Sequence, residues 1–140
     1  MKSKTVKLKE NNYDFVVFAI VSAEDDSYLV WNINNILMLD LKRTEHPVLK
    51  NRISDGKTVS CFNYMCNNTG IEYLFIGNKY GELELFPQLS NVDFILKISG
   101  NLTNECIKHI AVAIRTVKGI TACINLNVKK TPLFDVFGKI

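Results

Sequence analysis

Short apolar segments separated by polar turns run along the whole chain, and their lengths are typical of strands. Residues 15–21 are apolar at every position, and residues 74–76 and 110–114 are apolar throughout as well. A strand with one solvated face alternates apolar and polar residues, whereas a continuous apolar run indicates that both faces are covered. We therefore expect these segments to lie between two packed layers.

Helical periodicity is weak in this sequence. The strongest helix candidate is 105–116, but Ile and Val dominate it, and β-branched residues favour strands. The pattern therefore predicts an all-β chain with a strand at 107–114, and a helix over 105–116 is the alternative.

The predicted strands fall into three similar units of four strands, at a spacing near 46 residues. An Asn ends the third strand of each unit, at Asn32, Asn78 and Asn127. After it the chain turns and enters a last strand. The three units cover residues 5–41, 47–88 and 94–138 of a single domain, 1–140.

This period and strand order resemble a WD40-like β-propeller, in which four-stranded antiparallel sheets stack radially as blades. Where the family carries a Trp-Asp pair, this chain reads Leu39-Asp40, Leu85-Phe86 and Phe134-Asp135. The acid is kept twice, the Trp is never kept, and the family's Gly-His pair has no counterpart. The resemblance covers residues 5–138 and implies three degenerate tandem blades of a partial propeller.

Three blades cannot close a ring, because propellers have about four to eight. Open blades would leave apolar faces and strand edges in water, which favours association. Three alternatives follow. The chain is a piece of a longer one, a partner or a second copy completes the ring, or the repeat is accidental and the strands form a compact sandwich or barrel.

The composition is that of an ordinary soluble domain. The chain has 140 residues, of which 47% are hydrophobic and 22% charged, with a net charge of +3. This weak basic balance does not favour a nucleic-acid partner. No uncharged apolar run approaches the roughly 20 residues of a membrane span. The four cysteines form no C-x-x-C pair and are expected to be reduced, which favours a cytoplasmic or nuclear protein.

No motif for nucleotide binding, metal binding or catalysis is present, so we expect no cofactor, no metal ion and no enzyme activity. The two histidines are His46, in a polar loop, and His109, within an apolar segment expected to be core. A hydrolase with a nucleophile bonded to one of them is a rival hypothesis.

WD40-like proteins commonly hold other proteins, so the resemblance implies a non-catalytic interaction scaffold, a subunit or fragment of a multiprotein assembly. Its partners would be other proteins, the remaining blades of a longer chain, or a second copy. Trp31 is expected in the core rather than at the binding rim. The candidate interaction residues lie near predicted hairpin ends: Asn34, Asn35, Lys79, Tyr80, Lys129 and Lys130.

The alternative function is a module that binds nucleic acid or anionic lipid through a weak basic rim. Phosphate binding weakens steeply with added salt, whereas a protein interface with an apolar core responds little. A salt titration therefore separates the two functions.

Overall fold

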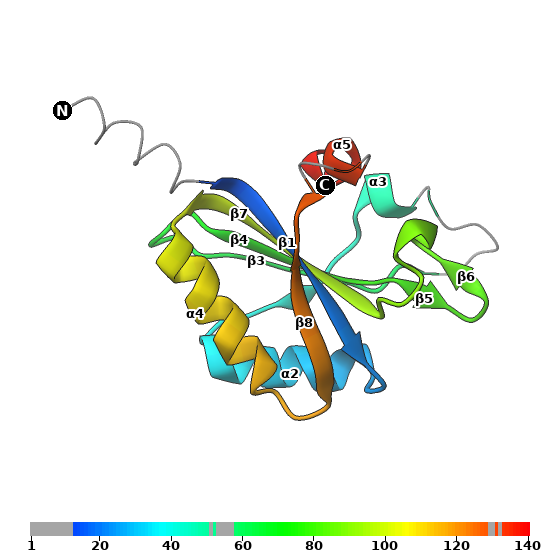
Figure 1. Ribbon diagram of the computed structural model, residues 1–140, viewed down its shortest axis with the longest axis horizontal. Coiled ribbons are helices and arrows are strands. Elements are labelled where there is room, and N and C mark those ends of the chain that lie inside the picture. The colour runs from blue at the N-terminus through cyan, green and yellow to red at the C-terminus, as the bar shows by residue number, and fades with distance from the viewer. Residues whose placement is uncertain (1–12, 51, 53–57, 129–130, 132) are drawn as a thin grey trace.

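One antiparallel sheet of six strands forms the centre of the protein (Figure 1). The computed structural model describes residues 13–50, 52, 58–128, 131 and 133–140. The strand order in the sheet is β2-β3-β4-β7-β1-β8. These strands are β1 (Tyr13–Ser22), β2 (Lys42–Arg43), β3 (Cys61–Met65), β4 (Glu72–Gly77), β7 (Phe94–Leu102) and β8 (Ile120–Leu126). A separate hairpin pairs β5 (Lys79–Tyr80) with β6 (Leu83–Glu84).

Strand β1 lies inside this sheet, between strands from the far end of the chain. It pairs with β7 on one side and with β8 on the other, antiparallel in both cases. Strands from all three predicted units therefore share one continuous sheet. The prediction of tandem four-stranded blades is wrong.

Two helices cover one face of the sheet (Figure 1). They are α2 (Asp26–Leu37) and α4 (Asn104–Arg115). Their buried side chains join one cluster with side chains of β1, β4 and β7, including Phe18, Phe75 and Leu96. The chain is thus mixed α/β, and the all-β prediction is wrong.

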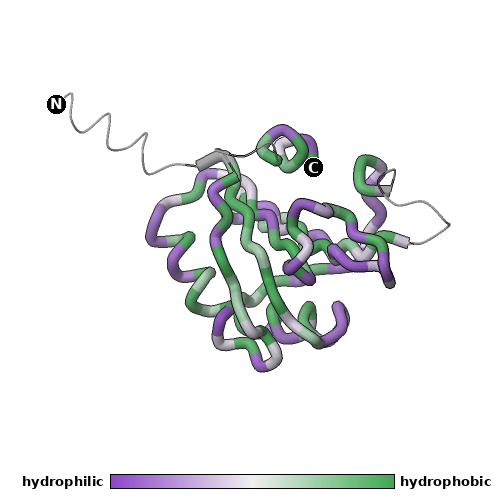
Figure 2. The backbone as a smooth tube through the Cα atoms, turned by 45° about the vertical axis from the view of Figure 1, so that its right-hand side comes forward, coloured by the Kyte–Doolittle hydropathy of each residue, from purple (hydrophilic) through white to green (hydrophobic). Residues whose placement is uncertain are grey.

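The opposite face is covered by smaller elements. These are α3 (Pro47–Lys50), the β5–β6 hairpin, the 3-10 turn η1 (Pro87–Leu89) and α5 (Leu133–Gly138). Leu49, Phe86 and Phe137 pack there with Val17 of β1 and Ile76 of β4. The expectation of coverage on both faces is confirmed for the runs 15–21 and 74–76, although helices and turns cover them rather than neighbouring blades (Figure 2). It is wrong for 110–114, which lies in helix α4 and leaves Val112 exposed.

Helix α2 occupies a region that was predicted to hold two strands. The Asp25 carboxylate caps it by accepting a hydrogen bond from the Tyr28 amide at 2.8 Å. Leu29, Val30 and Ile33 then fall on one side of the helix and are buried against the sheet. The polar run before Tyr28 is therefore the start of a helix.

Helix α4 occupies the expected strand at 107–114, so the alternative helix is the correct structure. The Thr103 hydroxyl accepts a hydrogen bond from the Cys106 amide at 3.2 Å, which caps the first turn. Glu105 in the first turn and Arg115 in the last complement the helix dipole. Burial of one apolar side outweighs the weak helix propensity of its Ile and Val residues.

The three Asn residues that suggested a repeat lie in three different environments. Asn32 is in α2, Asn78 is buried, and Asn127 follows β8. The Asn78 side chain holds the β5–β6 excursion together, because it donates to two backbone carbonyls at 2.9 Å and accepts from the Phe86 amide at 2.7 Å. The described residues show no stacked blades, so the family resemblance stays unconfirmed.

A tight turn at Gly119 sets β8 beside β1. Gly119 has φ +98°, and a Cβ there would lie 2.5 Å from Cγ of Glu24. Its carbonyl accepts a 2.7 Å hydrogen bond from the Ser22 hydroxyl at the end of β1. Only glycine fits both the backbone conformation and the space.

The residue that ends helix α2 has an unfavourable backbone conformation, and its cost can be tested. Met38 has φ +57°, and its amide donates to the Asn34 carbonyl. A side chain in this left-handed region costs about 1 kcal/mol or more. We expect Met38→Gly to raise the free energy of unfolding by about 1 kcal/mol in chemical denaturation. Met38→Ala should stay near wild type, and a Gly variant of unchanged stability would contradict this helix end.

Candidate functional site

The side of α2 that faces away from the sheet carries large apolar side chains. Trp31 is 68% exposed, Tyr28 38% and Met38 84%, and Asn35 is exposed between them. Positions separated by three or four residues share one side of a helix, as Tyr28, Trp31 and Asn35 do, and Met38 follows at the left-handed C-cap. We call these four residues the outward face of α2.

The outward face of α2 differs sharply from that of α4, the other helix of the same layer. The exposed positions of α4 include Glu105, Lys108, His109 and Arg115, as expected for a solvated helix. The outward face of α2 has no charged residue. The buried centres of protein interfaces are likewise rich in Trp, Tyr and Met and poor in charged residues.

Of the two Asn residues predicted to bind a partner, only Asn35 lies on this face. Asn34 anchors the chain that leaves the helix, because its side chain accepts from the Leu41 amide at 2.9 Å and donates to the Leu41 carbonyl at 3.3 Å. Asn34 therefore joins α2 to the segment that follows the helix.

A second candidate is a polar cleft at the N-terminal end of α2. Its volume is about 460 Å³, and its lining includes two predicted residues, Lys79 and Tyr80. Further lining side chains come from α2, β2 and the ends of the sheet strands: Asp26, Arg43, Ser60 and Asp93. Ser60 supplies a hydroxyl, which is a potential nucleophile in this cleft.

Asp26 is the most connected side chain in the cleft. Its Oδ2 accepts a hydrogen bond from the Ser60 hydroxyl at 2.5 Å and lies 3.5 Å from Nη2 of Arg43. Burial alone would raise the pKa of Asp26, but the hydrogen bonds from Ser60 and Ser27 and the Arg43 charge together lower it. Asp26 is thus held ionised and ties α2 to β2 and to the start of β3.

Tyr80 and Lys79 are also engaged within the protein. The Tyr80 hydroxyl donates to the Gly77 carbonyl and accepts from the Ser60 amide, both at 2.8 Å. Burial raises the pKa of Tyr80 to about 12. Lys79 Nζ lies 3.4 Å from Oδ1 of Asp93. These contacts hold the cleft together and leave little polar capacity for a ligand.

The other candidate residues are two lysines and the two histidines of the rival hypothesis. Lys129 and Lys130 lie outside the described residues. His109 is exposed on α4, not buried in a strand, and His46 is half-buried with no hydrogen-bond partner for Nδ1. Within the described ranges, neither histidine is hydrogen-bonded to a nucleophile. The same residues contain no group of three metal-binding side chains and no helix long and apolar enough to cross a bilayer.

The cysteines are four free thiols. Cys61 and Cys123 are buried, and burial raises the pKa of each to about 11. Cys66 and Cys106 are half-buried. The two buried thiols are therefore protonated and unreactive near neutral pH.

Trp31 is the residue that sequence reasoning misplaced, since it was expected in the core. The spacing of Tyr28, Trp31, Asn35 and Met38 opposite the buried positions of α2 was the available signal. It was hidden because the segment was divided into two strands.

No protein-family model, curated protein or solved structure matches this chain.

The network around Asp26 gives a prediction for stability against pH. We expect Asp26→Asn to lower the free energy of unfolding by about 1 kcal/mol at pH 7. The folded-state pKa of Asp26 is lowered, so its carboxylate stabilises the folded chain fully above about pH 4, where Asp26 of the unfolded chain is also ionised. This stabilisation is lost as pH falls through the folded-state pKa of Asp26. Denaturation of both proteins at pH 7 and at about pH 3, which lies below the pKa of an unfolded Asp, should show the difference shrinking. A difference that is constant over this range would contradict the assignment.

Proposed function

We propose that this chain is a non-catalytic protein-interaction module that docks on another protein through the outward face of α2. The observation that supports this most strongly is the exposure of Trp31, at 68%, between Tyr28 and Met38 on a surface without charge. Trp and Tyr are the residues that most often dominate the energy of protein interfaces.

The energy available from this face is large for one helix. An aromatic side chain buries roughly 150–250 Å². At about 25 cal/mol per Å² of apolar surface, covering the exposed part of Trp31 alone would contribute roughly 2–4 kcal/mol before association costs. Tyr28 and Met38 add to the same patch. A partner with a complementary apolar surface would gain this energy.

The alternative of phosphate binding through a basic rim is less favoured by the described surface. Three cations near the cleft and the β2 edge each have a carboxylate neighbour: Lys42 with Asp40, Arg43 with Asp26, and Lys79 with Asp93. Paired cations attract phosphate weakly, because their field is partly cancelled. These ion pairs favour a protein partner over nucleic acid or anionic lipid.

Trp31 is the chain's single tryptophan, so its fluorescence reports on the proposed interface directly. We expect the isolated protein to show the emission of a solvated indole that iodide quenches readily. On formation of the complex, the emission should shift to shorter wavelength and become protected from iodide. Short-wavelength emission that iodide does not quench in the isolated monomer would contradict the proposal.

A matched pair of variants tests the interface by affinity capture of the tagged chain from its native cells. Trp31→Ser should reduce the co-purifying protein at least about tenfold, as expected for a hot-spot residue. The control is Val112→Ser on α4, because Val112 is 60% exposed and equally apolar, but lies on the charged helix surface. It should retain the partner.

Both substitutions are at exposed positions, so each should change the free energy of unfolding by less than about 0.5 kcal/mol. Equal retention of the partner by Trp31→Ser and wild type would overturn the proposal. If the captured partner is a second copy of the chain, the solution mass should fall to that of the monomer in Trp31→Ser.

A further inference from the structure

A groove runs between α4 and β8, apart from the outward face of α2. Its volume is about 440 Å³. Val16, Ile107 and Val128 are buried apolar residues that line it, and the exposed side chains of Lys108 on α4 and Asn125 on β8 border it. No Asp or Glu lies among the residues that line the groove.

The two edges of the sheet differ in how they are protected against pairing with another strand. The β2 edge has two residues, Lys42 and Arg43, and both are charged. Strand β8 has seven residues with no charge, proline or glycine, and it pairs with β1 alone among the described strands. Long uncharged edges are the ones that accept a further strand.

The peptide groups of Cys123 point to the free side of β8. Its partner across the ladder is Ile20, and the Ile20 carbonyl accepts from the Asp93 amide at 3.0 Å, on the side of β7. Ile20 and Cys123 therefore form a non-hydrogen-bonded pair. By alternation the peptide groups of Asn125 point outward too. No described residue bonds to the amides of Cys123 and Asn125.

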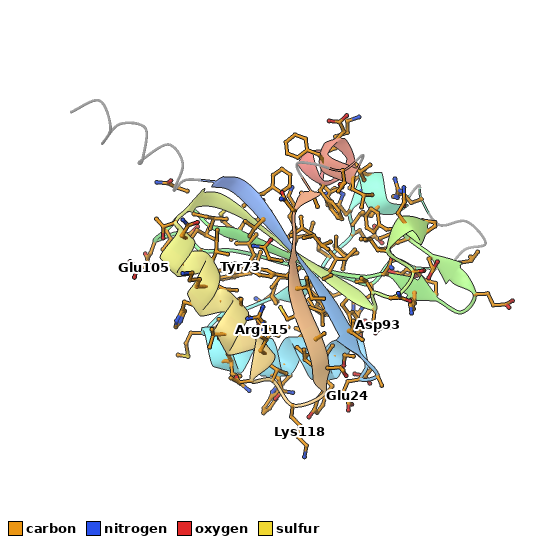
Figure 3. All side chains as sticks on the ribbon, viewed as in Figure 1. Glu24, Tyr73, Asp93, Glu105, Arg115 and Lys118 are labelled. Atoms are coloured by element: carbon orange, nitrogen blue, oxygen red, sulfur yellow. The ribbon has the colours of Figure 1, made fainter. Side chains whose placement is uncertain are left out.

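Arg115 closes part of this edge. Its Nε and Nη2 donate to the Cys123 carbonyl at 3.1 and 3.0 Å. Figure 3 shows the Arg115 side chain between α4 and β8. A neutral carbonyl is a weaker partner for a guanidinium than a carboxylate, which can bind it with two parallel hydrogen bonds. An incoming acidic side chain could therefore draw Arg115 away and expose the edge.

We propose that an extended acidic peptide segment adds to β8 as a further strand, with its carboxylates bound by Arg115 and Lys108. Backbone hydrogen bonds to Cys123 and Asn125 supply the strand pairing, and the two cations on α4 select acidic side chains. This surface is independent of the outward face of α2, so either one can fail without the other.

Charge argues against two other occupants. A second copy that paired its β8 in full antiparallel overlap would be centred on Cys123, and it would bring the two Arg115 side chains together at the symmetry axis. The N-terminal segment of this chain carries Lys2, Lys4, Lys7 and Lys9, which would face Lys108 and Arg115. An acidic partner meets neither repulsion.

Fluorescence anisotropy with the full chain tests the charge requirement. The probes are labelled peptides of alternating Glu and Val, of alternating Lys and Val, and of alternating Glu and Gly. We expect the Glu–Val peptide alone to bind well, because it combines acidic side chains with strand propensity. Equal binding of the Glu–Gly peptide would indicate a non-specific charge effect and overturn the proposal.

Substitutions test the two cations. Arg115→Gln and Lys108→Gln should each weaken Glu–Val binding by about tenfold, the usual effect of losing a charge-assisted hydrogen bond. Lys118→Gln is the matched control, because it removes the same charge from a residue that Figure 3 shows beyond the turn, pointing to solvent. Circular dichroism confirms that each variant is folded. Wild-type affinity in both test variants would overturn the proposal.

Hydrogen exchange tests the backbone pairing. Binding of the Glu–Val peptide should slow exchange at the amides of Cys123 and Asn125, while a peptide N-methylated at alternate residues should bind much more weakly. Unchanged exchange at both amides, or equal binding of the methylated peptide, would contradict strand addition. Strand addition by the peptide would also be contradicted if dimerisation of the free chain already protected these amides from exchange.

Discussion

The burial of β1 on both faces and along both edges is the constraint on which the rest of the structure depends. Phe18 and Ile20 point into the cluster under α2 and α4, and Val17 and Ala19 point into the cluster on the opposite face. A strand without a solvated side must be central, so the chain has to return to it from both directions. Strands β7 and β8 provide those returns, and the covering helices follow from the two apolar faces that this arrangement creates.

The sequence allowed prediction of the long sheet strands but not of their partners, and it also placed strands where α2 and α4 lie. The runs at 15–21 and 74–76 lie within β1 and β4, because a continuous apolar pattern is a local property. What covers such a strand is set by contacts between distant residues, which a one-dimensional pattern does not contain. Helix α2 was missed because the cap at Asp25 and the helical spacing of its buried residues were given too little weight. Helix α4 was only the alternative, because its β-branched residues were given more weight than the cap at Thr103.

The same limit explains the candidate site residues. Lys79 and Tyr80 were chosen because they lie at a hairpin, and they do, but their hydrogen bonds and ion pair hold the polar cleft together. Asn34 and Asn35 are adjacent in sequence and have different roles, since the helix turns one inward and the other outward. The exposed position of Trp31 follows from helical spacing, which became informative only once the segment was known to be one helix. The proposed interaction surfaces are therefore consequences of packing that composition does not show.

The pairing of β1 with β8 can be measured directly, and both the single sheet and the outward-facing edge depend on it. In an antiparallel ladder, the Cα atoms of a non-hydrogen-bonded pair lie closest, at about 4.5 Å. We expect strong NMR cross-relaxation between the Hα protons of Ile20 and Cys123, and between those of Phe18 and Asn125. Strong Hα contacts between Ala19 and Ile124 instead, or none between the two strands, would contradict this account.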